Sequence, residues 1–191
     1  DQVAIDAVIQ APDNREMVVP AFFFQDYEPD TISGVEMLLP KGAPGWRLRF
    51  APPLPGVYRW RLRMRNGGQT VLSPEATFTC AAASGRHGYL RVSKRNPRYL
   101  VFDDGEPFFG VGMNMATLDA GRMASATRWY TRFAEAGGNL VRSWWCGSGT
   151  DVESEVSPRP DTGLGRYRQE DCWRIDQLMG LCERLGIHMM C

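Results

Sequence analysis

The sequence predicts a mixed fold in two parts, an all-β sandwich followed by the beginning of a β/α barrel. Three observations support this prediction. Nine of the 13 prolines fall in the first 74 residues, whereas 14 of the 20 glycines follow position 84. Apolar side chains recur with a period of two in the first part and with helical spacing in the second. The small-residue segment 81–85 lies between them, so we predict domains over residues 1–84 and 85–191.

Two strands are predicted near the N-terminus. Residues 3–9 and 18–24 are apolar and rich in β-branched and aromatic side chains, which favours β-strands. Pro12-Asp13-Asn14 separates the two segments and is typical of a turn. The polar segment 26–30 follows the second strand, and we expect it to end that strand.

The next two strands carry an alternating pattern. In residues 46–50 and again in residues 58–64, large apolar side chains alternate with arginines. This period of two places the apolar side chains in the core and the arginines in water. Asn66-Gly67 predicts a type I′ hairpin turn, because both central positions of that turn need positive φ, and residues 69–80 form the returning strand. A β-sandwich over residues 1 to about 83 follows from this pattern.

The aromatic residues and the arginines of these strands also permit functional interpretations. Trp46, Tyr58 and Trp60 could form a platform on which sugar rings stack, and the arginine row could bind a ligand. The alternation favours a structural role for both groups, with the aromatic rings in the core and the arginines solvated.

The second part predicts a parallel sheet with helical connections. Between Ala126 and Ala134 the apolar spacing changes to that of a helix, which ends at Gly137-Gly138. The apolar run 107–112 ends at Met113-Asn114, and a second helix is closed by Gly186. The order strand, helix, strand, helix, strand is typical of β/α folds. The predicted strands are residues 89–92, 99–102, 107–112, 139–145 and 187–191, and the second helix includes Ile175 to Leu185.

The composition is that of a globular protein and excludes several partners. The 191 residues include 22 basic and 22 acidic side chains, so no basic field is present to attract nucleic acid. No stretch approaches the roughly 18 apolar residues of a membrane span. The five cysteines show no CxxC spacing, so neither a disulfide framework nor a zinc site is indicated. We therefore expect no cofactor, metal, nucleic acid or membrane insertion, and the sequence leaves the oligomeric state open.

Several segments resemble a known enzyme family. Residues 88–92 and 98–114 are similar to the entry to the catalytic barrel of clan A glycoside hydrolases, near family 5. Phe133 to Trp145 resemble the second strand of that barrel, in the order helix, Gly, Asn, hydrophobic, Arg, and Ile175 to Ile187 resemble its second helix and third strand. Residues 19–24 and 46–50 resemble the N-terminal immunoglobulin-like domain of related bacterial enzymes. The resemblance implies an immunoglobulin-like β-sandwich followed by the first three strands and two helices of a truncated (β/α)8 TIM barrel, because a complete barrel has eight strands.

The resemblance also implies an activity. Such an enzyme hydrolyses β-linked poly- or oligosaccharides, as cellulases do, by a retaining mechanism with two glutamates. In this family the glutamates follow the fourth and seventh strands, so we expect them beyond this chain and the chain alone to be inactive. The full-length parent is expected to be extracellular or periplasmic, although this N-terminus shows no signal-peptide pattern. The alternative function is a noncatalytic carbohydrate-binding or adhesive β-sandwich module.

Four candidate site residues stand at the C-terminal ends of the predicted barrel strands. The arginine that matches Arg142 supports the ionised nucleophile in the family, so we expect a supporting role for Arg142, with a structural ion pair as the alternative. Asn114 is expected either to bind a sugar hydroxyl or to cap the following loop. Trp144 and Trp145 would face opposite sides of a continuing strand, so one of them binds substrate, and the pattern leaves open which.

A long polar loop follows residue 145 and offers carboxylates that could act as a local acid and base. Acidic residues of surface loops are mostly solvated, which favours a structural interpretation. The two histidines, His87 and His188, have no nucleophile nearby in the sequence, and we expect both to be structural. The segment from Gly110 lacks the third glycine of a dinucleotide fingerprint. The acidic candidates are Asp151, Glu153, Glu155, Asp161, Glu170 and Asp171.

Overall fold

The computed structural model describes residues 3–82, 85, 87–146, 149–153 and 163–191. Over these residues the protein is mainly β-sheet, with two helices and no closed barrel. The chain divides into two compact units that do not follow its linear order. The first unit comprises residues 1–24, 44–89 and 103–105, and the second comprises residues 25–43, 90–102 and 106–191.

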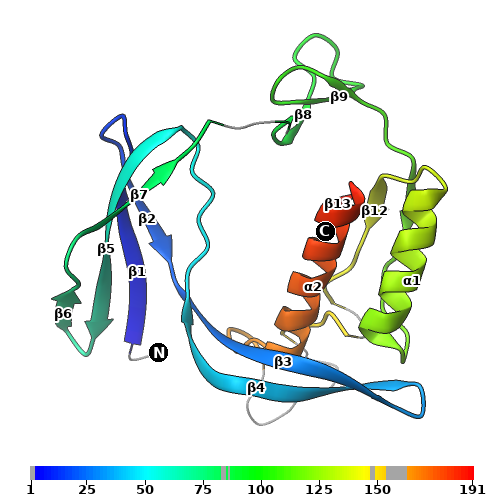
Figure 1. Ribbon diagram of the computed structural model, residues 1–191, viewed down its shortest axis with the longest axis horizontal. Coiled ribbons are helices and arrows are strands. Elements are labelled where there is room, and N and C mark those ends of the chain that lie inside the picture. The colour runs from blue at the N-terminus through cyan, green and yellow to red at the C-terminus, as the bar shows by residue number, and fades with distance from the viewer. Residues whose placement is uncertain (1–2, 83–84, 86, 147–148, 154–162) are drawn as a thin grey trace. The chain divides into compact units, whose positions relative to one another are not determined.

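A five-stranded antiparallel sheet forms the first unit (Figure 1). Two successive strands, β6 and β7, pair with the same edge of the central strand β5, because the predicted strand over residues 69–80 is interrupted near Pro74. Proline cannot donate a ladder hydrogen bond, so the halves before and after it pair separately, with the end and the beginning of β5. The strands of the sheet are β1 (Val3–Gln10), β2 (Glu16–Pro20), β5 (Gly56–Asn66), β6 (Gln69–Leu72) and β7 (Ala76–Cys80), with β1 between β2 and β5.

The hairpin between β5 and β6 turns one residue later than predicted. Its central residues are Gly67 and Gly68, with φ values of 52° and 87°, and Asn66 pairs with Gln69 in the ladder. The prediction of an Asn66-Gly67 turn was therefore wrong by one residue. Two consecutive glycines adopt the positive φ values of a type I′ turn with no side-chain penalty, so Gly67 and Gly68 form the turn and Asn66 stays in the strand.

The alternating pattern of β5 gives the first unit its core. Tyr58 is fully buried and stacks on Phe78, with ring centroids 5.0 Å apart and an interplanar angle of 2°. Its hydroxyl donates to the Leu54 carbonyl at 2.8 Å and accepts from the Leu54 N–H at 3.1 Å. The side chain therefore fills the core and closes the turn that precedes β5. Ala7, Ile9 and Ala11 complete this buried cluster.

The arginines of β5 lie on the opposite face, as the alternation predicts. Asp6 on the neighbouring strand is buried and accepts from Arg63 at 3.0 Å and from Arg65 at 2.7 Å. Arg61 lies 3.5 Å from Glu75, and both of these side chains are about half exposed. The arginines of β5 are thus partly exposed to solvent, and acidic side chains of neighbouring segments partly neutralise their charge.

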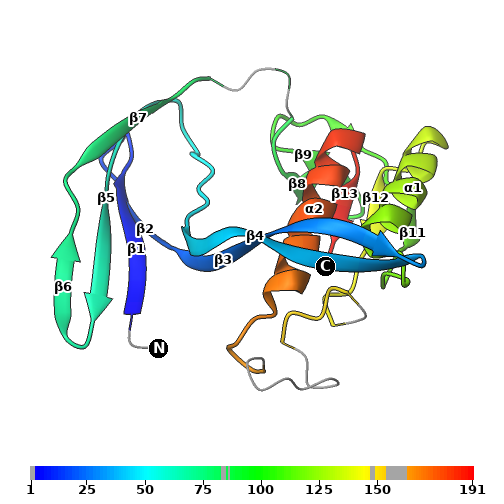
Figure 2. The same cartoon turned by 60° about the horizontal axis from the view of Figure 1, so that its bottom comes forward.

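A long hairpin differs from the prediction. β3 (Phe22–Ile32) and β4 (Val35–Arg47) form a two-stranded sheet, so residues 26–30 continue a strand where a turn was expected (Figure 2). The turn lies instead at Ser33 and Gly34, with φ values of 53° and 79°. Polar residues are tolerated in β3 because residues 28–32 are exposed.

The apolar residues that follow this hairpin cover the sheet of the first unit. The predicted strand over residues 46–50 ends at Arg47, and Leu48 and Phe50 pack on the buried cluster from an irregular segment. Within the described part of this unit, the five-stranded sheet therefore faces this segment and not the second full sheet of the expected sandwich.

The second unit contains the predicted parallel sheet. Strands β11 (Gly112–Asn114), β12 (Leu140–Arg142) and β13 (His188–Met190) pair in chain order, and α1 (Arg122–Glu135) and α2 (Gln169–Leu185) connect them. The predicted strand over residues 139–145 is shorter than expected, because its ladder ends at Arg142. The two helices contact each other and share a core with Val141 of the sheet.

A small antiparallel sheet precedes these strands. It consists of β8 (Leu90–Val92), β9 (Leu100–Phe102) and β10 (Pro107–Phe108), so the predicted strand over residues 107–112 is divided between β10 and β11. The rings of Phe102 and Phe108 lie 5.4 Å and 4.9 Å from the imidazole of His188, measured between ring centroids. The small sheet thereby packs against the N-terminal end of β13.

Candidate functional site

Two predicted site residues are neighbours at the ends of parallel strands. Asn114, the last residue of β11, is paired in register with Arg142, the last residue of β12, and Arg142 is paired with Met190 of β13. Residues paired in this way project from the same face of a sheet. They line a cleft of about 310 Å³ together with Gly112, Met113 and Leu140.

Trp144 lies beside Arg142. The Arg142 guanidinium carbon is 5.5 Å from the centroid of the Trp144 ring, and 46% of Trp144 is exposed. The contact of the Arg142 side chain that the structure describes is with this ring, and the choice between a supporting role and a structural ion pair stays a prediction. An exposed guanidinium, an amide and an indole face therefore gather at one end of the sheet.

Trp145 has a different environment. It is half-buried, and its indole N–H has no acceptor among the residues that the structure describes. Because β12 ends at Arg142, the strand does not continue to residue 145, and the expected alternation of the two tryptophans does not apply. Of the two tryptophans, Trp144 is the one that contacts Arg142.

Backbone hydrogen bonds join the residues that follow β11 to the end of β12 and to the residues that follow it. The Met115 N–H donates to the Arg142 carbonyl at 2.9 Å, and the Trp144 N–H donates to the Ala116 carbonyl at 3.0 Å. The buried Thr150 hydroxyl then donates to the Trp144 carbonyl at 2.8 Å. These bonds continue the pairing of the two strands beyond their ends and fix the backbone that carries Trp144.

Two of the acidic candidates, Asp171 and Glu153, have partners outside the strand-end cleft. Asp171 is buried in the first turn of α2 and accepts from the Arg174 guanidinium at 2.5 Å. Burial raises the pKa of Asp171, and the guanidinium groups of Arg174 and Arg168 oppose that rise. Glu153 accepts the N–H of Gly165 at 2.9 Å. Glu155 and Asp161 lie outside the described residues.

A buried charged group at the starts of the two helices was not predicted. Glu36, on the β3–β4 hairpin, accepts from Arg174 at 2.7 Å and from the Met123 N–H at 2.9 Å. The hairpin is held on α2 by two more bonds, from the Gln25 N–H to the Gln169 side chain and from the Trp173 indole to Asp26. Glu36 and Arg174 are 138 positions apart, so no local spacing in the sequence could have paired them.

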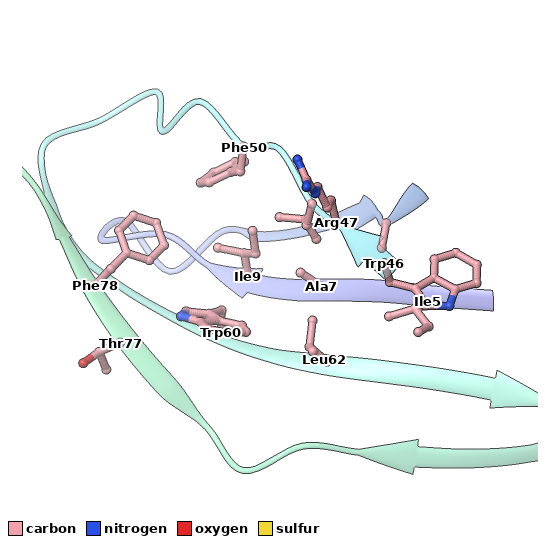
Figure 3. Close-up of a pocket in the computed structure, with 12 residues that line it drawn as sticks. Ile5, Ala7, Ile9, Trp46, Arg47, Phe50, Trp60, Leu62, Thr77 and Phe78 are labelled. Carbon is pink, nitrogen blue, oxygen red and sulfur yellow. The ribbon is translucent and has the colours of Figure 1, made fainter. Parts of the chain in front are cut away.

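The first unit contains a larger cavity of about 620 Å³ (Figure 3). Ile9 and Trp60 of the sheet lie on one side of the cavity, and Phe50 and Arg47 lie on the other. Trp46 lines the cavity and is 44% exposed, whereas Tyr58 is buried with both hydrogen bonds of its hydroxyl satisfied. The cavity thus brings Trp46 and Trp60 together and leaves Tyr58 out of any exposed platform.

The described residues form neither a metal-binding cluster nor a membrane-spanning helix. Across the residues described, no three His, Cys, Asp or Glu side chains gather in a way that could hold a metal ion. Neither α1 nor α2 is long and apolar enough to cross a membrane.

Comparison with known proteins reveals a similar fold in one solved structure. No protein-family model matches the sequence, and no curated protein matches it. The structure is similar to that of a candidate glycoside hydrolase from Bacteroides vulgatus, with a TM-score of 0.62 and 18% identity over 98% of this chain. This chain spans only 36% of that protein. At this identity the likeness shows a shared fold.

Two further matches come from Bacteroides uniformis. They are structures of β-glucuronidases, one of them covalently bound to cyclophellitol-6-carboxylate aziridine. Each is 15% identical to this chain and covers 98% of it and 18% of the β-glucuronidase. Their TM-scores are 0.28 and 0.26, so the superposition adds no structural argument.

Proposed function

We propose that this chain is the N-terminal part of a glycoside hydrolase and contributes Asn114, Arg142 and Trp144 to the substrate site. The observation that carries the proposal is the register pairing of Asn114 with Arg142 at the C-terminal ends of adjacent parallel strands. Enzymes built on parallel β/α sheets assemble their sites at these strand ends. The fold shared with the candidate glycoside hydrolase from Bacteroides vulgatus supports the proposal.

The proposed architecture is an immunoglobulin-like domain followed by the first three strands of a (β/α)8 barrel, with the boundary near residue 84. In support, the Tyr58 hydroxyl bonds back to the Leu54 backbone, as the tyrosine corner of immunoglobulin-like domains does. The strand and helix order of residues 112–190 also matches the repeating unit of a barrel. Residues 25–43 of the hairpin precede this boundary in the sequence but belong to the second compact unit.

The proposed chemistry is retaining hydrolysis of a β-linked poly- or oligosaccharide, with both catalytic glutamates supplied by further strands of a longer parent. The Arg142 guanidinium, exposed at the end of β12, would pair with the nucleophile and keep it ionised. Trp144 offers an exposed ring face for a sugar, and Asn114 offers both a donor and an acceptor for a hydroxyl. The parent is proposed to act outside the cytoplasm.

A second candidate function is ligand binding by the first unit, without catalysis. The observation that favours it is the cavity of about 620 Å³ that Trp46 and Trp60 line. Binding sites are commonly concave, mostly apolar and lined by aromatic side chains, with a few polar groups to orient the ligand. Arg47 is a polar group in this position.

One titration separates the two candidates. Oligosaccharides of β-linked glucose are added to this chain, and binding is followed by isothermal calorimetry. The proposed function predicts weak binding that Trp144→Ala abolishes and Trp46→Ala preserves. The opposite result, with binding lost only in Trp46→Ala, would transfer the sugar site to the first unit. Hydrolysis is tested separately in a parent protein that contains this chain, with aryl β-glycosides as substrates.

A further inference from the structure

Glu36 joins three elements at one buried point. It stands on β4, its side chain is only 4% exposed, and its two carboxylate oxygens have different partners. One oxygen accepts from Arg174 of α2 at 2.7 Å, and the other accepts from the Met123 N–H of α1 at 2.9 Å. The backbone N–H of Glu36 also donates to the Ala120 carbonyl at 3.2 Å, just before α1. Hairpin and helices are thus tied together through one residue.

Glu36 supplies what the start of α1 lacks. The N-cap residue of that helix is Gly121, which has no side chain to accept a backbone N–H, and its first turn contains no acidic residue. A carboxylate near a helix N-terminus satisfies free N–H groups and interacts favourably with the helix dipole. The Glu36 carboxylate performs both roles from another element of the fold.

The same residue completes the charge balance at the start of α2. Arg174 is 8% exposed and lies between Glu36 and Asp171, which is itself 2% exposed. A buried guanidinium requires compensating negative charge and hydrogen-bond acceptors on each side. Without Glu36, Arg174 would keep Asp171 as its one acidic partner among the described residues, and the Met123 N–H would lose the acceptor that Glu36 provides.

The start of α1 is the far end of a segment that carries part of the site. This segment follows β11 and runs from Asn114 to Gly121. Within it, the Ala116 carbonyl accepts the Trp144 N–H. A carboxylate that holds the start of α1 therefore restricts this segment at the end opposite to the site.

We propose that Glu36 is a positioning residue for the strand-end site, acting through the start of α1 on the placement of Trp144. This inference rests on the proposed function only for the role of Trp144 in ligand binding. The placement of Trp144 itself is a property of the chain that can be measured without a ligand.

The test uses fluorine NMR of the whole chain labelled with 5-fluorotryptophan. The chain has six tryptophans, and Trp144→Phe identifies the Trp144 resonance by its loss. In Glu36→Gln, we expect this resonance to shift or split beyond its linewidth at temperatures well below the melting transition. Glu28→Gln is the matched control, because Glu28 lies on the same hairpin and is exposed, and this variant should leave the spectrum unchanged.

Two outcomes would overturn the proposal. One is an unchanged Trp144 resonance in Glu36→Gln together with a lower melting temperature, which would make Glu36 a purely structural residue. The other is an equal shift in the Glu28→Gln control. Should Glu36→Gln fail to fold, Arg174→Lys tests the same contact, because lysine keeps the charge but loses the guanidinium that bonds to Glu36. The proposal expects this variant to shift the Trp144 resonance, and an unchanged resonance would overturn it. Failure of the proposed function would show instead as no oligosaccharide binding by the wild-type chain, whatever the NMR result.

Discussion

The Arg142 guanidinium lies 5.5 Å from the centroid of the Trp144 ring, two residues along the chain. Arg142 ends β12, and the Trp144 backbone is bonded to Ala116 beyond the end of β11. A cation–π contact between exposed groups contributes about 0.5–1 kcal/mol, enough to favour one orientation of the guanidinium but too little to bury it. Arg142 is thus oriented at the strand end while its hydrogen-bond donors stay accessible.

The first prediction concerns Arg142 in a catalytically active parent. If the guanidinium pairs with the nucleophile, Arg142→Ala should lower kcat by roughly 10²-fold or more, with a smaller change in KM, because the lost interaction acts on the chemical step. Arg142→Lys should restore little activity, since an ammonium group cannot reproduce the planar guanidinium fork. The measurement is steady-state kinetics per active site, together with thermal melting.

Arg132 provides the control for this experiment. It is exposed in the last turn of α1, away from the strand ends, so Arg132→Ala should leave kcat unchanged. Near-normal turnover in Arg142→Ala, with only a lower melting temperature, would assign Arg142 a structural role and remove it from the proposed site.

The second prediction concerns Tyr58 and the turn before β5. Tyr58→Phe keeps the buried ring but removes the hydroxyl that bonds to both backbone groups of Leu54. Leaving these groups without a partner should lower the free energy of unfolding by about 1–3 kcal/mol. Tyr58→Ala should cost more, roughly 3–5 kcal/mol, because it also leaves a cavity in the core. Urea denaturation followed by tryptophan fluorescence measures both values.

Trp46→Phe is the comparison for the Tyr58 variants. Trp46 is 44% exposed, so the smaller ring should change the free energy of unfolding much less than Tyr58→Ala does. An unchanged stability in Tyr58→Phe would mean that water replaces the hydroxyl at Leu54, and the tyrosine-corner interpretation would then lose its energetic basis.

The sequence predicted the elements that depend on local periodicity. The alternation from Tyr58 to Met64 and the glycines that end the helices correctly placed β5, α1 and α2. It also placed Asn114 and Arg142 at strand ends, because parallel β/α order determines which end of each strand they occupy. These features are set by spacing within a few residues of each position.

The features that the sequence did not predict depend on distant contacts. Residues 26–30 have the composition of a turn, yet they extend β3, and the chain turns later, at Ser33-Gly34. The ion pair of Glu36 with Arg174 joins residues far apart in the chain, and no periodicity relates them. Tertiary packing decides such positions and overrides local propensity.

The third prediction concerns the reactivity of the cysteines. Burial raises the pKa of the Cys182 thiol to about 11, whereas Cys146 is exposed. Because the thiolate is the reactive form, iodoacetamide at pH 8 should modify Cys182 at least about 100-fold more slowly than Cys146 in the native chain. Peptide mass spectrometry over a time course gives both rates. In guanidinium chloride the two rates should converge, and rapid native modification of Cys182 would show that the core around α2 is open.

The fourth prediction concerns the pH dependence of stability. His188 lies against the rings of Phe102 and Phe108, and burial there lowers the pKa of its imidazole below the ordinary value near 6.5. The folded state therefore disfavours the protonated form, so the contribution of His188 to stability is present above pH 6.5 and is lost as the pH falls through its lowered pKa.

The measurement for His188 compares the wild-type chain with His188→Phe between pH 7.5 and pH 5. The carboxylates titrate equally in both proteins, so the difference between their melting temperatures isolates the histidine. We expect the melting temperature of the wild type to fall relative to that of the variant as the pH decreases, because phenylalanine fills the same apolar contact without accepting a proton. A difference that stays constant across this range would mean that the imidazole is solvated, and that the small sheet does not cover the N-terminal end of β13.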